Sequence, residues 1–222
     1  MPDLVDLQIA LFALVAYLIG SISGSLVLGR LRDVDIRTMG SGNAGGTNAL
    51  RTVGWAFALG VVLIDLGKGV VSAWPLPLLG PVVAALFGTT PPDPLVLACT
   101  CGFAAVLGHV WPVWFGFRGG KGAGTAVGAV LVLAPWCVLP LLVVWLVTLI
   151  GTGYVGLATI LAGLSLVPSM YLAGPEPLPT VLGVLSVALA VLLVFTHRSN
   201  LVRLASGTEN RFEKARVLKR RK

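Results

Sequence analysis

The segment 122–152 reads GAGTAVGAVLVLAPWCVLPLLVVWLVTLIGT and contains no charged residue. It is longer than the roughly 20 apolar residues that one helix needs to cross a bilayer. Pro135 lies near its middle and offers a place for a break, because proline interrupts a helix. We therefore interpret the segment as two short membrane-spanning helices, which must be helical because the bilayer core has no water to satisfy an exposed backbone.

Other apolar segments lie on both sides of this one, and the composition agrees with a membrane protein. Hydrophobic residues make up 56% of the chain and charged residues only 11%, with a mean hydropathy of +0.94. So few charges cannot cover the surface of a soluble domain of this size. The further segments are 4–29, 55–79, 95–115, 154–172 and 180–196. The sequence thus predicts an all-α integral membrane protein with about seven transmembrane helices, forming a single polytopic domain over residues 1–222.

The cations lie at alternate ends of the predicted spans. Of the 16 Lys and Arg residues, four lie in or beside the first loop, two in the third loop, nine in the tail 197–222 and one inside a span. The opposite loops contain none. The positive-inside rule then places the N-terminus outside and the C-terminus in the cytoplasm. The net charge of +7 belongs to one membrane face and does not indicate a nucleic-acid partner.

The first loop, residues 33–51, reads DVDIRTMGSGNAGGTNALR. Its clustered glycines allow successive backbone N–H groups to turn toward one anion. Arginines and neutral hydrogen-bonding side chains surround them, a combination that suits phosphate. The alternative is a flexible solvated loop, but plain linkers rarely interleave Asn, Thr and Arg so densely. The residues that we single out here are Arg37, Gly40, Ser41, Gly42, Asn43, Thr47, Asn48 and Arg51.

The third loop, residues 108–125, reads GHVWPVWFGFRGGKGAGT. Its centre resembles a nucleotide-binding P-loop, but Gly122 stands where that motif needs Ser or Thr, and no strand precedes it. ATP binding is therefore not predicted. What remains is a glycine loop that opens a helix, with Lys121 at its mouth. Helix N-termini attract anions through their N–H groups and dipole, so Gly119, Gly120 and Lys121 are candidate phosphate ligands.

The tail begins with polar residues at the depth of the two loops. Leu201 and Leu204 are three apart, which predicts a short amphipathic helix on the membrane surface. For His197, Arg198 and Asn200 a binding site and a topology anchor are equally supported, whereas the cations of 219–222 are interpreted as an anchor.

Few polar side chains lie inside the predicted spans. Asp65 and Lys68 are three apart on one helix face, and charge in a membrane is usually paired and functional, although a structural ion pair explains them nearly as well. Three cysteines lack the spacing of a redox or zinc pair. We interpret Cys99, Cys101 and Cys137 as packing residues.

Together these segments resemble the acyl-phosphate:glycerol-3-phosphate acyltransferase family, the PlsY type. The resemblance rests on three motifs in order, within 20–51, 108–125 and 197–209, and covers nearly the whole chain; Asp65 and the pair Lys68-Gly69 also fit. It implies transfer of a fatty acyl group from acyl phosphate to the 1-hydroxyl of sn-glycerol 3-phosphate. The products would be lysophosphatidic acid and phosphate, in the first acylation step of phospholipid synthesis at a bacterial-type inner membrane. Three residues depart from the family pattern without removing a charge: Ser23, Gly46 and Gly156.

The resemblance also implies roles for residues. It assigns catalysis to His197, Ser41 and Lys121, and phosphate or head-group binding to Arg37, Gly40, Gly42, Asn43, Thr47, Asn48, Arg51, His109, Gly119, Gly120 and Asn200. Acyl phosphate is a mixed anhydride with a good leaving group, so no metal, cofactor or covalent nucleophile is expected. The general base stays open between His197, His109 and the substrate phosphate. The sequence names no obligate protein partner.

A different class of function is a secondary transporter for an organic phosphate. Such transporters place their polar sites near the membrane midplane, commonly in paired halves of the chain. Here the polar residues gather at one predicted face, and no paired halves are visible. A purely structural membrane subunit would not need the two glycine-rich cationic loops. We therefore favour the enzyme.

Overall fold

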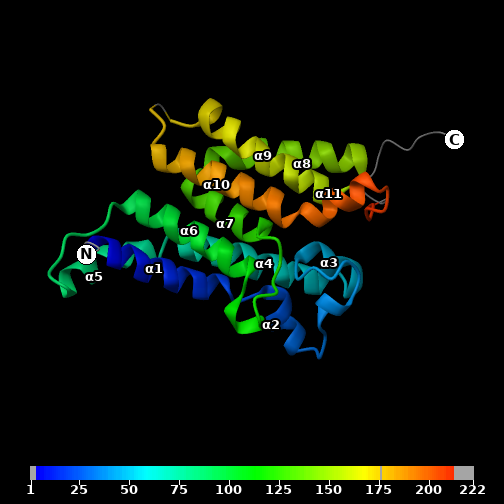
Figure 1. Cartoon of the computed structure of the whole chain (residues 1–222), viewed down its shortest axis with the longest axis horizontal. Helices are drawn as coiled ribbons and strands as arrows, with labels where there is room; N and C mark the ends of the chain where they lie inside the picture. The colour runs from blue at the N-terminus through cyan, green and yellow to red at the C-terminus, as the bar shows by residue number, and fades with distance from the viewer. Residues whose placement is uncertain (1–3, 176, 213–222) are drawn as a thin grey trace. The chain divides into compact units, whose positions relative to one another are not determined.

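The computed structural model describes residues 4–175 and 177–212, and all regular secondary structure within these ranges is helical (Figure 1). The chain divides into two compact units, Met1–Leu133 and Ala134–Lys222, which are described separately below. Six of the predicted tail cations, those of 214–222, lie outside the described residues. The assignment of residues 1–222 to one domain stays a prediction.

The first unit contains seven α-helices, three of them very short. They are α1 (Leu4–Gly20), α2 (Gly24–Arg30), α3 (Gly46–Thr52), α4 (Trp55–Ala73), α5 (Gly80–Leu86), α6 (Pro94–Val110) and α7 (Ala123–Leu133), with 3₁₀ turns at Ile36–Thr38, Pro77–Leu79 and Val113–Phe115. α6 begins with Pro94 in its first turn, and the Asp93 side chain caps it by accepting hydrogen bonds from the N–H groups of Leu95 and Val96 at 2.9 Å.

Glycines allow the long helices of the first unit to touch backbone to backbone. A side chain at Gly20 would overlap the backbone of Ala105, so α1 and α6 meet there. Likewise, a side chain at Gly69 or Gly128 would overlap the facing helix of the α4–α7 pair. Small residues are the usual means of close helix packing in membranes, where no hydrophobic effect drives helices together. These contacts fix the register of α6 and α7 against α1 and α4.

The second unit contains α8 (Pro135–Thr152), α9 (Val155–Ala173), α10 (Thr180–Thr196) and α11 (Arg198–Ala205). α8 ends at Gly153, whose φ of 78° is the left-handed conformation that glycine adopts at helix ends. α11 is bent by 52° from α10. It corresponds to the short amphipathic helix that the leucine spacing of the tail predicted.

By length and hydropathy the structure has four helices able to cross a membrane, or up to six if each bent pair counts as one span. The predicted span 4–29 is such a pair, because α1 and α2 are bent by 48° around residues 21–23. The segment 122–152 does divide at Pro135, as predicted. However, α7 has only 11 residues, or about 16 Å at 1.5 Å per residue. It is too short to cross a bilayer alone, so the prediction of seven full spans is not met.

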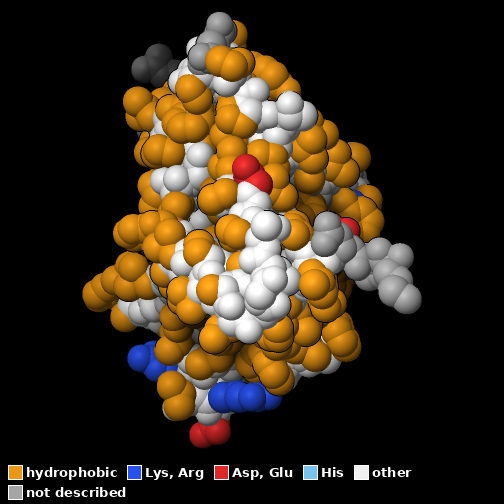
Figure 2. Space-filling model, turned by 90° about the vertical axis from the view of Figure 1, so that its left-hand side faces the viewer, with side chains coloured by type: hydrophobic (Ala, Val, Ile, Leu, Met, Phe, Trp, Pro, Cys, Tyr) orange, Lys and Arg blue, Asp and Glu red, His pale blue; other side chains and the backbone are white. Residues whose placement is uncertain are grey.

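Hydrophobic side chains dominate the face shown in Figure 2, where Lys and Arg side chains are visible only near the lower edge. Large apolar side chains such as Leu86, Leu172 and Val191 are 64% to 87% exposed, which in water would be unfavourable but in lipid is not. The three cysteines are buried, as their interpretation as packing residues predicted: Cys99, Cys101 and Cys137.

Candidate functional site at the cationic loops

Asn48 organises the first loop from the middle of α3. Its side chain is buried, and its Nδ2 donates to the carbonyls of Ile36 and Met39 at 2.9 and 3.0 Å. Its Oδ1 accepts from the N–H of Ser41 at 3.0 Å. Gly40 has a φ of 56°, and a side chain there would collide with Asn48 Oδ1. Asn48 therefore holds the turn around Ser41, although the sequence suggested a head-group ligand.

The predicted anion nest of the first loop is partly occupied by the protein itself. Gly42, with a φ of 71°, donates its N–H to the Met39 carbonyl at 3.0 Å, and the Ser41 N–H is bound by Asn48. Both Ser41 and Gly42 are exposed, while Asn43 and Thr47 are half-buried. The side chains, more than these two backbone N–H groups, are thus the donors that the loop presents.

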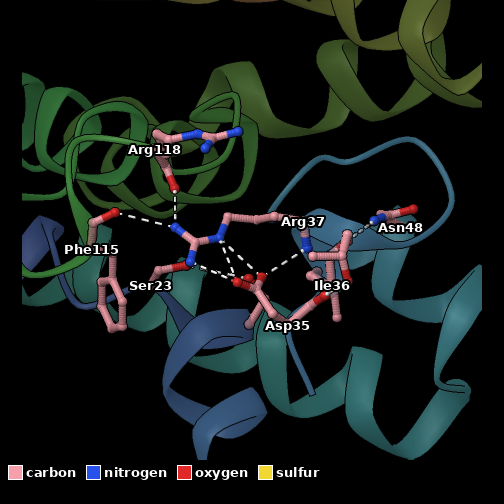
Figure 3. A network of polar contacts seen from close by, with 9 residues as sticks. Ser23, Asp35, Ile36, Arg37, Asn48, Phe115 and Arg118 are labelled. Atoms are coloured by element: carbon pink, nitrogen blue, oxygen red, sulfur yellow. Dashed lines mark hydrogen bonds and ion pairs between the residues drawn. The ribbon is translucent and has the colours of Figure 1, made fainter. Parts of the chain in front are cut away.

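Arg37 connects the first loop to the third (Figure 3). Its guanidinium binds the Asp35 carboxylate in two-pronged fashion, with Nε–Oδ1 at 2.9 Å and Nη2–Oδ2 at 2.7 Å. Its Nη1 also donates to the carbonyls of Phe115 and Arg118, at 3.2 and 3.3 Å. This planar fork is a geometry that Arg provides and Lys does not. The Arg37 donors, predicted for phosphate, are here used to hold two loops together.

The ion pair shifts the acid–base behaviour of both partners. The pKa of the Asp35 carboxyl is lowered below 3.8, chiefly by the side-chain hydrogen bonds from Arg37, which outweigh the opposing effect of partial burial. The pKa of the Arg37 guanidinium is raised, chiefly by the same hydrogen bonds. The exposed Arg118 lies near enough to lower the pKa of Asp35 further. The contact is therefore fully ionised at neutral pH.

The glycines of the third loop pack onto the end of α6. The N–H groups of Gly119 and Gly120 donate to the carbonyls of Val110 and His109, at 3.2 and 3.1 Å, and so satisfy helix-end acceptors. The sequence had suggested these two N–H groups as phosphate donors. A side chain at Gly120 would overlap His109 Nε2 and would approach the Ala44 carbonyl of the first loop at 2.9 Å. The two loops are thus in contact, with Lys121 half-buried beside them.

Beneath the third loop lies a buried cluster of charged groups. Asp65 Oδ1 is 3.2 Å from Lys68 Nζ and 3.4 Å from His109 Nδ1, and these three side chains are only 4% to 5% exposed. Asp65 Oδ1 also accepts the N–H of Gly24 at 3.1 Å, and Lys68 donates to the Ile22 carbonyl at 2.9 Å. Both backbone groups belong to the break between α1 and α2. The charges thus supply hydrogen-bond partners at a break where lipid could not.

The predicted site residues of the second unit are His197 and Asn200. His197 is buried, and its Nδ1 lies 2.8 Å from the Leu193 carbonyl. Because a carbonyl only accepts hydrogen bonds, Nδ1 must carry the proton, which leaves Nε2 as the basic nitrogen of the neutral ring. Asn200 donates to Glu209 Oε1 at 2.8 Å and packs directly against Gly156. A side chain at position 156 would overlap Asn200, which accounts locally for this departure from the family pattern.

The structure therefore brings together the predicted residues of the first and third loops within the first unit and places His197 and Asn200 in the second. Arg51 is exposed at the end of α3. Sequence reasoning missed the roles of Asp35 and Glu209. Glu209 is bound by Asn200 and, at 2.7 Å, by Arg203 Nε. Asp35 could have been found, because an Asp side chain in a turn often accepts the backbone N–H two residues on, as Asp35 Oδ1 does from Arg37 at 3.0 Å.

Three comparisons agree on the relationship of the chain to known proteins. Residues 10–207 match the model of the family described as glycerol-3-phosphate acyltransferase. The glycerol-3-phosphate acyltransferase of Chlorobaculum parvum is 39% identical over 223 residues, covering 89% of this chain and 93% of that protein. The corresponding protein of Aquifex aeolicus is 38% identical, with coverage of 91% and 99%.

Solved structures are similar as well. A crystal structure of PlsY, an integral membrane glycerol 3-phosphate acyltransferase, in its glycerol 3-phosphate form has a TM-score of 0.78 at 34% identity. The alignment covers 92% of this chain and 95% of that one. The lysophosphatidic acid form of PlsY has a TM-score of 0.76 at 33% identity.

Proposed function

The chain belongs to the glycerol-3-phosphate acyltransferase family, and on that premise we propose that its first and third loops form the phosphate-binding surface for the acylation of glycerol 3-phosphate to lysophosphatidic acid. The observation that carries the assignment is the contact between these loops through Arg37. It brings the exposed Ser41 and Gly42 of one loop into the same assembly as Lys121 of the other.

Acyl phosphate is the proposed donor. The glycerol 3-phosphate 1-hydroxyl oxygen attacks the acyl carbonyl carbon, the bond from that carbon to the phosphate oxygen breaks, and inorganic phosphate leaves with the electron pair. The hydroxyl proton passes to a base, for which His197, His109 and an oxygen of the substrate phosphate stay the candidates. Because the leaving group is already good, the protein has to align the two substrates and stabilise negative charge.

Within this proposal Lys121 supplies a point charge for a phosphate, and Ser41 and Thr47 supply neutral hydrogen bonds. Asn48 and Arg37 hold the loops that carry these groups, as their contacts with the backbone indicate. Arg51, exposed on α3, adds a second cation. Two phosphate groups, one on each substrate, thus meet two cationic loops.

The proposed orientation places both loops and the tail in the cytoplasm and the N-terminus outside. Its support is the distribution of Lys and Arg along the sequence. An N-terminus and a C-terminus on opposite sides require an odd number of crossings. With the third loop in the cytoplasm, the 11 residues of α7 would have to make one of these crossings, which a segment of this length can do only where the bilayer is locally thinned.

The test is turnover by the purified full-length protein with acyl phosphate and glycerol 3-phosphate, followed as phosphate release and as lysophosphatidic acid formed. We expect both products in equal amounts, in the presence of EDTA and without ATP. Complete loss of turnover on chelation, restored by magnesium, would contradict the metal-free mechanism. Use of acyl-CoA in place of acyl phosphate would contradict the donor assignment.

A further inference from the structure

One carboxylate oxygen in the first unit connects three separate parts of the chain. Asp65 Oδ1, in the middle of α4, is approached by Gly24 N–H at the start of α2, by Lys68 Nζ one turn along, and by His109 Nδ1 at the end of α6. The distances are 3.1, 3.2 and 3.4 Å. A buried charge is stable only when it is paired and hydrogen-bonded, and here one oxygen receives all three contacts.

His109 extends this cluster to the third loop. It occupies the last turn of α6, and its carbonyl accepts the Gly120 N–H at 3.1 Å. The ring lies against the same residue, since any side chain at Gly120 would overlap Nε2. The next residue along the chain is Lys121. A rotation of the His109 ring would therefore press on the backbone that carries this lysine.

We propose that Asp65 is a positioning residue for the glycine segment 119–122: it fixes the orientation of His109, and His109 fixes the backbone at Gly120 and so the reach of Lys121. The inference rests on the proposed function, because it concerns the same phosphate-binding loop. In this proposal Asp65 itself touches no substrate. Replacing it should nevertheless change how well the protein uses one of its two phosphate substrates.

Lys68 provides a matched control for this effect. It shares the ion pair with Asp65, but its other contact is with the Ile22 carbonyl at the break between α1 and α2. This break meets the third loop at Val113, whose N–H donates to Ser21, and not at the glycine segment 119–122. Removing either partner leaves one buried charge unpaired, so both Asp65→Asn and Lys68→Met are expected to lower the melting temperature. Only Asp65→Asn removes the negative charge that lies 3.4 Å from His109 Nδ1. A second control, Asp93→Asn, removes a carboxylate from the opposite end of α6.

The experiment measures kcat and KM for both substrates, together with thermal melting in detergent, for these variants and for His109→Ala. We expect Asp65→Asn and His109→Ala each to lower kcat/KM by about 10- to 100-fold, the scale of a misplaced catalytic group. The larger part should be a rise in KM for one of the two phosphate substrates, the same one in both variants. The kcat/KM of the double variant should lie within about 3-fold of that of the less active single variant, because Asp65 acts through His109.

A second pair of variants keeps the test independent of the stability of the Asp65 variants. Gly120→Ala alone should raise the same KM, because the added methyl group collides with His109. Adding His109→Ala to Gly120→Ala should recover part of that loss, since the ring has gone. Equal kinetic effects of Lys68→Met and Asp65→Asn, or multiplying effects of Asp65→Asn and His109→Ala, would overturn the inference. A wild-type protein inactive with both substrates would overturn the proposed function instead.

Discussion

Replacing Arg37 should weaken catalysis by releasing the third loop from the first, without removing a phosphate ligand. Arg37→Met deletes the hydrogen bonds from Nη1 to the carbonyls of Phe115 and Arg118 and breaks the ion pair with Asp35. The two carbonyl bonds are long, at 3.2 and 3.3 Å, and together contribute about 1 to 3 kcal/mol. That energy corresponds to roughly a 5- to 150-fold change in the ratio of docked to undocked loop.

The assay is the steady-state release of phosphate by purified protein over a range of both substrate concentrations. We expect kcat/KM of Arg37→Met to fall by about 10- to 100-fold. Arg37→Lys should recover little, because an ammonium group cannot donate to Asp35 and to both carbonyls in the same plane. Arg32→Met is the matched control. It removes a cation that lies just before the first loop in the sequence and contacts the Phe57 ring, and should stay near wild type.

Asp35→Asn separates this role from phosphate binding. If Arg37 holds the loops, loss of its carboxylate partner should impair catalysis in the same direction as Arg37→Met. If Arg37 binds phosphate directly, Asp35→Asn would free the guanidinium and leave the rate unchanged or higher. The folded pKa of Asp35 lies below 3.8, so the contribution of the pair is complete at neutral pH and is lost only as the pH falls through that lowered value. The effect of Asp35→Asn should therefore be constant from about pH 6 to 8, and wild-type kinetics for Asp35→Asn beside a severe Arg37→Met defect would refute the reasoning.

Three other predictions concern charge, proton transfer and topology. Lys121→Ala should cut turnover by about 100-fold or more, the scale of a lost electrostatic contact in the transition state, and Lys121→Arg should recover part of it; near wild-type rates in folded, inserted protein would place the site elsewhere. If His197 is the base, His197→Ala should remove the limb of the pH dependence of turnover that this imidazole sets; a limb that survives the substitution points to His109 or to the substrate phosphate. Single cysteines at Ser41 and Gly119 should react with a membrane-impermeant reagent from the cytoplasmic side and a cysteine at Asp93 from outside; labelling of Gly119 and Asp93 from one side would contradict the orientation.

Hydropathy alone located the long helices, because lipid forces each apolar stretch to be helical. It could not reveal the break between α1 and α2. Residues 21–23 read Ser-Ile-Ser, which is no more polar than many helix interiors. The break is stable because Asp65 and Lys68 reach it from another helix. For the same reason the sequence left open whether that ion pair was structural, and the contacts now give it a structural role at the break.

The sequence predicted which loops form the candidate site, but it did not predict the contacts that their residues make. The sequence marked the first and third loops by their glycines and cations, and the structure brings these loops together. The sequence did not predict that Asn48, Gly119 and Gly120 donate their hydrogen bonds to acceptors within the protein. Phosphate ligands and loop-shaping residues use the same donors, so composition cannot separate them, and only the partner atoms can.

The burial of all three cysteines affects how their thiols react with the solutions on the two sides of the membrane. A multi-pass membrane protein faces a reducing cytoplasm on one side and an oxidising exterior on the other. Cys99 and Cys101 are 3% and 0% exposed, and Cys137 is 0% exposed, so neither environment reaches a thiol. We therefore expect the three thiols of the folded chain to react slowly with oxidants on either side of the membrane. In practice, a cysteine added at the surface should react with a thiol reagent faster than these three buried cysteines.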